Sequence, residues 1–282
     1  MNKVKYAAII VVYNKSIEKS ITCDSLKNIS GFDVEIVVVD NSESDFGNNE
    51  VSKDRGYTYI SMHGNKGLSR AYNVAIDRTV SDVIVLFDDD TCVSEHYFEV
   101  LDNAVQIYQD VDVFAPVVYG QDGVIYSPNE FNFLRNKFIR CAEQKISQNK
   151  FNAIASCLAI RRTVFVDYRF NETLFVDQVD QYFFCEQRKL KRKFLKLDVA
   201  IHQNFYQRGS TLDSADAWKR MRLRLIDIAR HAKLMGGIYR ILGFIKCCGL
   251  SFQISKKSHS AEVLIKGIML SCRLLFSIPD SL

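Results

Sequence analysis

Residues 83–90 read VIVLFDDD, so that five apolar residues run directly into Asp88, Asp89 and Asp90. An uncharged run rich in β-branched residues indicates a strand covered on both faces, as in a parallel sheet. Three adjacent carboxylates repel one another, and a bound cation would offset that repulsion. Carboxylate oxygens suit Mg²⁺ or Mn²⁺. The stretch therefore predicts a metal site at the end of a buried strand, and the alternative is a solvated turn rich in Asp.

The surrounding sequence alternates strand and helix patterns. Apolar, β-branched runs predict strands, and segments with an apolar stripe or a polar face predict helices. This order predicts an α/β fold with a mostly parallel sheet and helices on both faces, in which ligands bind at the carboxyl ends of the strands. The predicted strands are 6–12, 34–39, 57–61, 83–87 and 111–118, and the predicted helices are 16–28, 68–79 and 95–108. Residues 119–150 read as a loop or hairpin bearing a helix.

Two further motifs lie at predicted strand ends or helix starts. Residues 37–42, VVVDNS, place Asp40 where it could accept a hydrogen bond from a ribose or a base, although an acid there also suits a turn or helix cap. Residues 64–73, GNKGLSRAYN, form a Gly-flanked turn opening a helix, with amide groups and Lys66 available to a phosphate. The turn matches neither a Walker loop nor GxGxxG, which argues against a nicotinamide enzyme.

Taken together, these elements resemble the family-2 glycosyltransferases in order and spacing. The resemblance covers about residues 5–215 and rests on Val12-Tyr13-Asn14, residues 39–42, residues 64–73 and residues 88–90. It implies the GT-A fold, a nucleotide-sugar donor and Mg²⁺ or Mn²⁺ as cofactor. The residues that it implies for donor binding are Tyr13, Asn14, Asp40, Asn65, Lys66, Gly67, Asp88 and Asp89, and those for the metal are Asp88 and Asp90.

The family also uses a general base in its second half. Residues 174–183, LFVDQVDQYF, resemble the F-x-D-x-V-D segment of rhamnosyltransferase-like members, which makes Asp180 the expected base. Asp177 is an acceptor-side neighbour whose charge could raise the pKa of Asp180. Without the other motifs, the two acids would read as favourable charges at a helix start.

Three further candidate site residues stand in less specific sequence motifs. Ser156 and Cys157 stand in a turn where related members often carry Gly, and they are expected on the acceptor side. His202 follows an apolar segment at 194–201, in a region where related members often place a metal ligand. Gly209-Ser210 follows seven residues later. A single His is more often structural than a ligand.

The charge distribution divides the chain. Residues 1–187 carry 18 Lys and Arg against 27 Asp and Glu, whereas residues 188–282 carry 19 against 6. The last part predicts helices at 216–235, 238–254 and 261–277 that combine apolar stripes with cations. Such helices suit an anionic membrane surface, so we expect a basic amphipathic region at 216–282 after a catalytic domain at 1–215. Within that domain, 1–120 is expected to bind the donor and 121–215 the acceptor.

Composition narrows the class of protein. With 48% hydrophobic and 25% charged residues, the chain is neither disordered nor collagen-like. Its eight cysteines show no zinc spacing, and the start Met1-Asn2-Lys3 leads into an apolar run too short for a signal peptide. We therefore expect a cytoplasmic protein, peripheral on the inner face of the plasma membrane.

The predicted function is inverting transfer of a sugar to a saccharide hydroxyl, with an acceptor carried on a polyprenyl diphosphate. This implies surface polysaccharide synthesis, such as O-antigen or capsule. The expected donor is dTDP-rhamnose, with a UDP-hexose next, and no nucleic-acid partner is expected. The alternatives are an inactive, membrane-bound relative of these enzymes, and a nucleotidyltransferase, against which residues 13–16, YNKS, argue because that class has a Gly-rich basic loop there.

Overall fold

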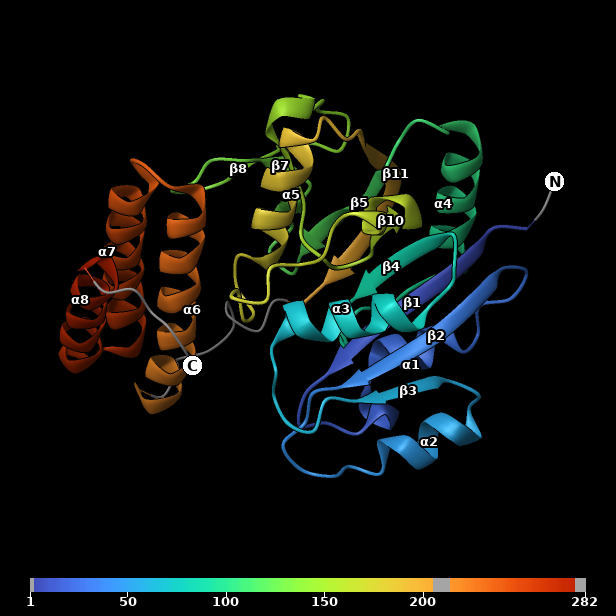
Figure 1. The fold of residues 1–282 in the computed structure, drawn as a ribbon, viewed down its shortest axis with the longest axis horizontal. Helices are drawn as coiled ribbons and strands as arrows, with labels where there is room; N and C mark the ends of the chain where they lie inside the picture. Colours follow the sequence, from blue (N-terminus) through green and yellow to red (C-terminus); the bar gives the residue numbers. More distant parts are fainter. Residues whose placement is uncertain (1–2, 205–213, 277–282) are drawn as a thin grey trace.

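The computed structural model describes residues 3–204 and 214–276. A central sheet runs through the larger part of the molecule (Figure 1). Its strands are β1 (Lys5–Val12), β2 (Asp33–Asp40), β3 (Thr58–Ser61), β4 (Val83–Phe87), β5 (Val113–Gly120), β6 (Ile125–Ser127), β10 (Leu158–Arg161) and β11 (Phe194–Gln203). Their order is β11-β5-β10-β4-β1-β2-β3, with β6 paired to β5. Because β10 and β6 pair antiparallel and the other pairs are parallel, the sheet is mostly parallel, as predicted.

Helices cover both faces of this sheet and divide its core in two. The first core lies under α1, α2 and α4, and the second under α3, α5 and η3. Aromatic side chains such as Phe98 of α4 and Phe183 of α5 are completely buried there. These helices are α1 (Ile21–Leu26), α2 (Asn48–Asp54), α3 (Leu68–Arg78), α4 (Glu95–Ile107) and α5 (Val179–Lys189), and the 3₁₀ turns are η1 (Ile17–Lys19), η2 (Gln148–Lys150) and η3 (Arg162–Val166).

Three local predictions were wrong. The helix expected at 16–28 is split into η1 and α1, because Ser20 is extended and its hydroxyl caps α1 at the Cys23 N–H, 3.1 Å away. The helix α2 was missed, since its polar sequence lacks apolar periodicity. Residues 119–150 hold no long helix but a hairpin and a second small sheet, β8-β7-β9, followed by the short turn η2. Its strands are β7 (Asn129–Glu130), β8 (Lys137–Phe138) and β9 (Phe151–Asn152).

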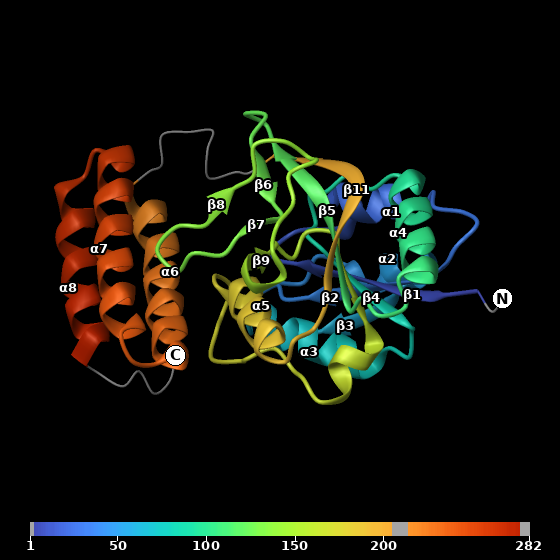
Figure 2. The same ribbon diagram turned by 90° about the horizontal axis from the view of Figure 1, so that it is seen from above.

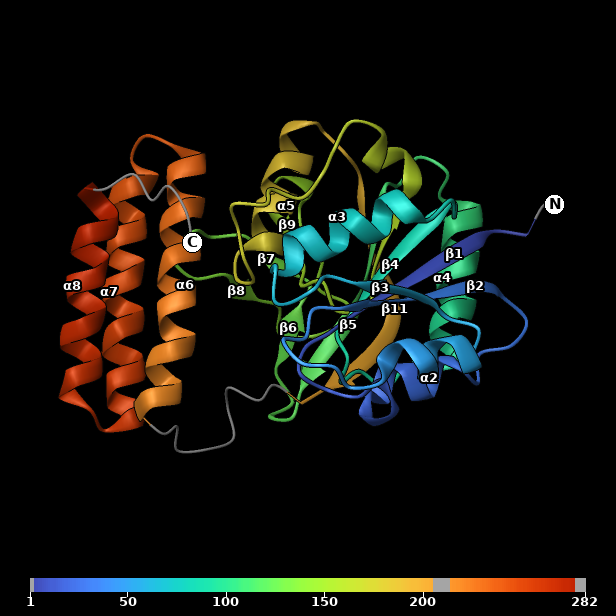
Figure 3. The same ribbon diagram turned by 60° about the horizontal axis from the view of Figure 1, so that its bottom comes forward.

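The last three helices form a bundle beside the sheet, and Figures 2 and 3 show α6 as the one nearest to it. They are α6 (Ser214–Met235), α7 (Tyr239–Ser258) and α8 (Ala261–Phe276). The bundle has its own core around Met221, Leu225 and Leu250. Gly243 lets α6 and α7 approach closely, because a Cβ there would lie 2.4 Å from the Ala232 Cβ. None of the described helices is long and apolar enough to cross a membrane.

Candidate functional site

The three aspartates follow β4 in the middle of the sheet. Their backbone is fixed from α1: the Thr22 hydroxyl donates to the Asp88 carbonyl at 2.5 Å, and the Ser20 hydroxyl donates to the Asp89 carbonyl at 2.8 Å. Both hydroxyl residues are buried. The turn that aims the carboxylates is therefore held by a helix near the start of the chain.

Two of these carboxylates converge on one side chain. The Nε2 of Gln203, at the end of β11, lies 2.9 Å from Asp88 Oδ2 and 3.2 Å from Asp90 Oδ1. Burial raises the pKa of both Asp88 and Asp90. Asp89 points elsewhere and pairs with Lys15 at 2.6 Å. The site thus holds two close carboxylates without a cationic partner of their own among the described residues, apart from the amide of Gln203.

This pair fits a divalent cation. The two oxygens already lie within hydrogen-bonding distance of a single nitrogen, and burial penalises their ionised forms, a cost that a cation would offset. Across residues 3–204 and 214–276, however, no three His, Cys, Asp or Glu side chains are arranged to hold a metal. Asp88 and Asp90 would supply two ligands, and other ligands must come from another residue type, from substrate or from water.

Asp40 lies at the end of β2 and is buried. Its Oδ1 accepts from the Ser42 N–H at 3.0 Å, while its Oδ2 accepts from Asn48 Nδ2 at 2.8 Å and from the Tyr59 hydroxyl at 3.1 Å. Burial, together with the Asp40 carboxylate, raises the pKa of Tyr59 to about 12. Asp40 is therefore a fixed acceptor, held by residues close to it in the sequence.

Tyr13 and Asn14 lie beside Asp40, after β1. The Asn14 N–H donates to the Ser42 hydroxyl at 2.9 Å, and its side-chain oxygen accepts from the Glu43 N–H at 3.0 Å. Tyr13 is exposed, and its hydroxyl lies 3.3 Å from Glu43 Oε1. The tyrosine ring is thus available to a ligand at this edge of the sheet.

The turn at 64–67 packs against the second half of the molecule. Asn65 Oδ1 accepts from Gly67 N–H at 3.2 Å, and the Lys66 N–H donates to Asn41 Oδ1 at 2.8 Å. Lys66 is exposed. Gly67 has φ +85°, and a Cβ there would lie 2.6 Å from the Phe175 carbonyl oxygen. This close approach brings the turn against residues 173–178, which we call the base loop because it precedes Asp180.

Asp180 lies in the first turn of α5, and its Oδ1 accepts from the Gln181 N–H at 2.7 Å. Burial raises the pKa of Asp180 to about 7, and the negative charges of Asp177 and Asp88 add to this shift. The influence of Asp88 places the two carboxylates within electrostatic range of each other. A carboxylate with a pKa near 7 can take up a proton near neutral pH.

The base loop is held from the bundle by Asp227 of α6. This buried carboxylate accepts from three successive N–H groups, those of Phe175 at 2.9 Å and of Val176 and Asp177 at 2.8 Å. Burial raises the pKa of Asp227 to about 6, although the three hydrogen bonds act in the opposite direction. The bundle therefore fixes the loop that leads into the expected base.

Further contacts hold the base loop against the bundle. Asp177, expected on the acceptor side, pairs with Arg220 at 3.1 Å and with Arg224 at 3.4 Å. Gln178, which precedes α5 with φ 67°, has its Oε1 3.2 Å from both His231 Nδ1 and Lys246 Nζ. Burial lowers the pKa of His231 to about 3, so this ring is neutral and its Nδ1 donates. Asp177 is thus engaged by α6 rather than free toward an acceptor.

The structure separates His202 from the carboxylates. Residues alternate in β11, so that the buried Gln203 points toward Asp88 while His202 is exposed and stacks on Tyr119, with ring centroids 5.4 Å apart. Strand alternation turns His202 to the face opposite Gln203, so the structure does not bring it to the carboxylates, and its role as a metal ligand stays a prediction. Gly209-Ser210 lies outside the described residues.

The two acceptor-side candidates in the turn before β10 are both buried. Ser156 lies on the metal side instead: its hydroxyl is 3.2 Å from Thr91 Oγ1, and its hydrogen bond to Asp88 opposes the rise in the pKa of that acid. The Cys157 thiol belongs to the core beside α4, where the Tyr97 hydroxyl donates to the Cys157 carbonyl at 2.8 Å. The side chain of Cys157 faces the interior, and its acceptor-side role stays a prediction.

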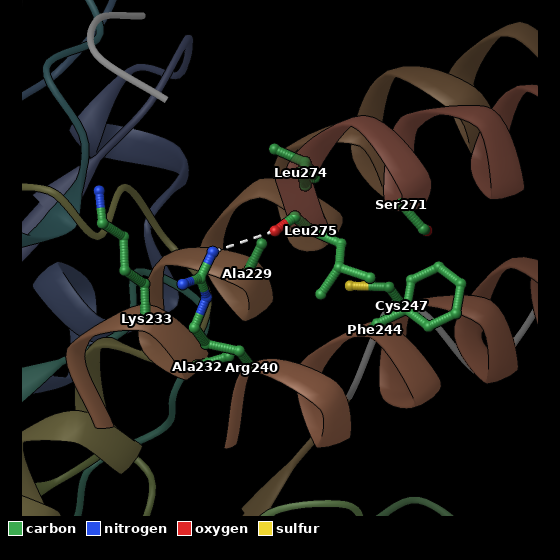
Figure 4. A pocket seen from close by; sticks show the side chains of 9 residues that line it. All are labelled: Ala229, Ala232, Lys233, Arg240, Phe244, Cys247, Ser271, Leu274 and Leu275. Carbon is green, nitrogen blue, oxygen red and sulfur yellow. Dashed lines mark hydrogen bonds between the residues drawn. The ribbon is translucent and has the colours of Figure 1, made fainter. Parts of the chain in front are cut away.

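A pocket lies within the bundle, between α6, α7 and α8 (Figure 4). Its lining is mainly apolar with two cations, and Arg240 donates to the Leu275 carbonyl at 3.1 Å. It contains no carboxylate and therefore lacks the ligands that a metal-bound diphosphate needs. It is lined by Ala229, Ala232, Lys233, Arg240, Phe244, Cys247, Ser271, Leu274 and Leu275.

Sequence reasoning missed Gln203 and Asp227. Strand alternation could have identified Gln203, since residues 199, 201 and 203 share one face of β11. Asp227 is an acid among the buried apolar residues Leu225, Ile226 and Ile228 of α6, which signals a buried partner for its charge.

Solved structures share this fold. The chain resembles S. aureus TarS, residues 1–349, with a TM-score of 0.53 and 19% identity over 96% of this chain and 81% of that one. It also resembles mannosyltransferase PcManGT from Pyrobaculum calidifontis in complex with GDP-Man and Mn²⁺, with a TM-score of 0.58 and 16% identity over 97% and 74%. A complex of TarS with UDP-GlcNAc gives a TM-score of 0.52 and 15% identity over 95% and 91%.

No curated protein matches the chain by sequence. The model of Glycosyl transferase family 2 matches residues 7–169, which include most of β1, the turn at 64–67, the three aspartates and β10. This match extends over more than half of the chain, and the mixed sheet agrees with the GT-A fold of the solved relatives. The chain therefore belongs to glycosyltransferase family 2.

Proposed function

We propose that the protein transfers a sugar from a nucleoside-diphosphate donor to a hydroxyl of a saccharide acceptor, with inversion at the anomeric carbon. One observation carries the proposal: Asp180, with a pKa near 7, lies within electrostatic range of Asp88, which forms a carboxylate pair with Asp90. Inversion needs one carboxylate to deprotonate the acceptor and a separate group to stabilise the leaving diphosphate.

In this reaction Asp180 Oδ2 takes the proton of the acceptor hydroxyl, since Oδ1 is held by the Gln181 N–H. Asp88 and Asp90 would hold Mg²⁺ or Mn²⁺, which supplies charge stabilisation to the departing diphosphate. Asp40 and the exposed Tyr13 bind the nucleoside at the edge of β1 and β2. Lys66 and the turn at 64–67 lie where a cation and amide groups favour a phosphate.

For the donor we propose dTDP-rhamnose first, because residues 175–180 keep the F-x-D-x-V-D pattern, and a UDP-hexose second. UDP-GlcNAc and GDP-Man are the donors bound in the solved TarS and PcManGT complexes. They support a nucleotide-sugar donor here and leave dTDP, UDP and GDP as the nucleotides to compare.

The bundle offers a surface for a lipid-linked acceptor. On α7, Ile241, Ile245 and Phe252 share one face and are 51–64% exposed. Three residues at the same spacing on α8 are 53–84% exposed, namely Ile265, Met269 and Phe276. We call these two faces the apolar ridges.

The apolar ridges lie side by side. Cys248 belongs to the first and Cys272 to the second, and the Cys272 thiol adds to burial in raising the pKa of Cys248. The same two helices carry exposed basic side chains at Lys256, Lys257 and Lys266, of which Lys266 pairs with Glu262. Exposed apolar side chains next to cations favour an anionic lipid surface. We therefore propose that the bundle holds the enzyme on the inner face of the plasma membrane, where it meets an acceptor on polyprenyl diphosphate in surface polysaccharide synthesis.

The donor proposal is tested by thermal shift with dTDP, UDP and GDP, with and without Mn²⁺. A ligand that binds only the folded state raises the melting temperature, so the donor nucleotide is expected to give a Mn²⁺-dependent shift. The matching nucleotide sugar is then incubated with lipid-linked saccharides, and release of nucleoside diphosphate is measured. Release of pyrophosphate would indicate a nucleotidyltransferase, and binding without any turnover would favour an inactive relative.

The membrane proposal is tested by sedimentation with anionic and neutral vesicles. Replacing Ile241, Ile245 and Phe252 by Ser is expected to abolish binding to anionic vesicles and to leave the nucleotide shift unchanged. The matched control is Val166→Ser, which removes a residue that is 84% exposed on the catalytic domain. Equal vesicle binding by both variants, or salt-dependent binding to nucleic acid instead, would contradict the proposal.

A further inference from the structure

The side chain of Gln203 makes only half of its hydrogen bonds. Its Nε2 donates to Asp88 Oδ2 at 2.9 Å and to Asp90 Oδ1 at 3.2 Å. Its Oε1 is buried and has no hydrogen-bond partner among the described residues, and the whole residue is only 6% exposed. Buried polar atoms nearly always have a partner, and leaving one without costs about 1–3 kcal/mol. No hydrogen bond to Oε1 therefore holds the amide in its present orientation.

The amide can turn over without breaking a hydrogen bond of its oxygen. An amide presents its nitrogen and its oxygen on opposite sides of one carbon, so a half-turn of the amide group exchanges them. The turned group would present Oε1 to the point where Nε2 now meets both carboxylates. Three oxygens around that point would repel one another unless a cation lay between them. In the present orientation the amide donates hydrogen bonds to both carboxylates without a cation. In the turned orientation its oxygen could bind a cation together with the two carboxylates.

We propose that Gln203 is a protein ligand of the divalent cation, together with Asp88 and Asp90, and that its amide turns over when the cation binds. The inference rests on the proposed function, since it takes the cation to be the one that the diphosphate requires. It also explains why no third His, Cys, Asp or Glu completes the site in the described residues.

The backbone holds Gln203 where this role needs it. It is the last residue of β11 and pairs in register with Gly120 of β5. The burial pattern of β11 alternates from Asp198 onward, so the neighbouring His202 is on the opposite face. Strand alternation therefore directs the amide of Gln203, and not the imidazole of His202, toward Asp88 and Asp90.

This choice of atom has a consequence for metal preference. Carboxylate and amide oxygens suit Mg²⁺ and Mn²⁺, whereas imidazole favours Zn²⁺ and later transition metals. The site is therefore expected to prefer Mg²⁺ and Mn²⁺ over Zn²⁺, and Gln203→His is expected to move that preference toward Zn²⁺.

The test is a titration of the full chain with Mn²⁺, in which electron paramagnetic resonance counts free Mn²⁺, alone and with each of dTDP, UDP and GDP. Gln203→Leu is expected to weaken Mn²⁺ binding by about 10–100-fold, the loss typical when the support of a metal site is removed. Gln203→Glu is expected to bind Mn²⁺ more tightly while melting at a lower temperature without metal, because it adds a third negative charge. His202→Ala is the control and is expected to bind like the original chain.

The outcomes separate this inference from the proposed function. If the original chain binds Mn²⁺ and Gln203→Leu, with an unchanged circular dichroism spectrum, binds it equally well, Gln203 is no ligand and the proposed function stands. Equal weakening by His202→Ala would also overturn the assignment. If Gln203→Leu is misfolded, the opposite shifts expected for Gln203→Glu decide the matter. If the original chain binds a nucleotide but no Mn²⁺ under any condition, both the inference and the metal dependence fail.

Discussion

The two acids that the proposed reaction needs at opposite ends of the site are held in different ways. Asp40, on the donor side, is fixed by Ser42, Asn48 and Tyr59, all within 19 residues of it. The base loop before Asp180 is fixed by Asp227, about 50 residues further along the chain. The donor side is a local structure, whereas the base side depends on a contact between two parts of the molecule.

This difference shows that the bundle is more than an attachment to the sheet domain. Its first helix supplies the acceptor for three backbone N–H groups of the base loop, and its cations engage Asp177 and Gln178. Disturbing the bundle should therefore alter catalysis as well as any association with lipid. Disturbing the network around Asp40 should alter donor binding alone.

The largest effect is expected for Asp180→Asn. An amide cannot take up the acceptor proton, so kcat should fall by about 10²–10⁴-fold while nucleotide binding is kept. In the original chain kcat should rise with pH up to about 7, as Asp180 loses its proton. Steady-state kinetics between pH 5 and pH 9 measure both. Near-normal turnover by the variant would mean that another group is the base.

The same variant should be more stable than the original chain at high pH. The folded state raises the pKa of Asp180 from 3.8 to about 7, so between these values it holds a proton that the unfolded chain releases. The free energy of unfolding of the original chain therefore decreases as pH rises through this window. Asn at position 180 does not titrate, so the variant shows no such decrease. The melting temperature of Asp180→Asn relative to the original chain should increase from pH 4 to pH 8, and a constant difference would contradict the shift.

A smaller loss is expected for Asp227→Ala, which leaves three N–H groups of the base loop without their acceptor. A misplacement of about 1 Å can cost about 10²-fold in rate, so kcat should fall by up to that factor while the donor KM changes little. The melting temperature should fall too, and Asp227→Asn, which keeps one acceptor oxygen, should be intermediate in both. Arg230→Ala serves for comparison: it removes a single hydrogen bond to the base loop, that to the Thr173 carbonyl, and should cause a smaller loss. A rise in the donor KM alone would show that the two sides are not distinct.

Gly67→Ala tests the contact that joins the two sides. The added Cβ would lie 2.6 Å from the Phe175 carbonyl oxygen, and the alanine would also have to adopt φ +85°. We expect about a tenfold loss in kcat/KM, measured at low donor concentration, because a left-handed residue costs about 1–2 kcal/mol even without the collision. The control is Gly64→Ala. This position has φ +105°, and an added Cβ would have no atom within 4 Å, so the variant tests the cost of the backbone conformation without a collision. Equal losses in the two variants would mean that the contact with Phe175 has no role.

The smallest effect is expected for Tyr59→Phe. It removes one of three hydrogen bonds to Asp40, worth about 0.5–1.5 kcal/mol, so the donor KM should rise by a few fold. Because this network is separate from the base loop, kcat should not change. A drop in kcat at saturating donor would show that the donor side also reaches the base.

Sequence patterns were sufficient for the fold where the signal is local. The apolar, β-branched runs at β1, β2 and β4 predicted buried parallel strands, and the stripe on α3 predicted its helix to within one residue. The helix α2 was missed because its buried residues, Asn48 and Ser52, are polar and give the sequence no apolar periodicity. The antiparallel β10 between β4 and β5 could not be predicted, since pairing direction depends on contacts between distant segments.

The candidate site also combines features that the sequence predicted with features that it could not predict. Motifs predicted that Asp40, Asp88 and Asp90 lie at the carboxyl ends of strands, the family resemblance indicated Asp180 as the base, and the roles of all four stay predictions. The sequence could not show that Asp177 faces two arginines of α6, or that Cys157 is in the core. For His202 and Gln203 the outcome depended on the register of β11, because a shift of one residue exchanges the two faces.

The hydrogen bonds to Asp227 also bear on how the protein is made. Because synthesis proceeds from the amino end at about 5–20 residues per second, the base loop leaves the ribosome several seconds before α6 does. Until α6 has emerged, the N–H groups of residues 175–177 lack the carboxylate that orders them. The sheet can therefore form early in translation, while the base becomes ordered only after the bundle has begun to fold. A nascent chain without α6 therefore lacks the acceptor for three N–H groups of the base loop.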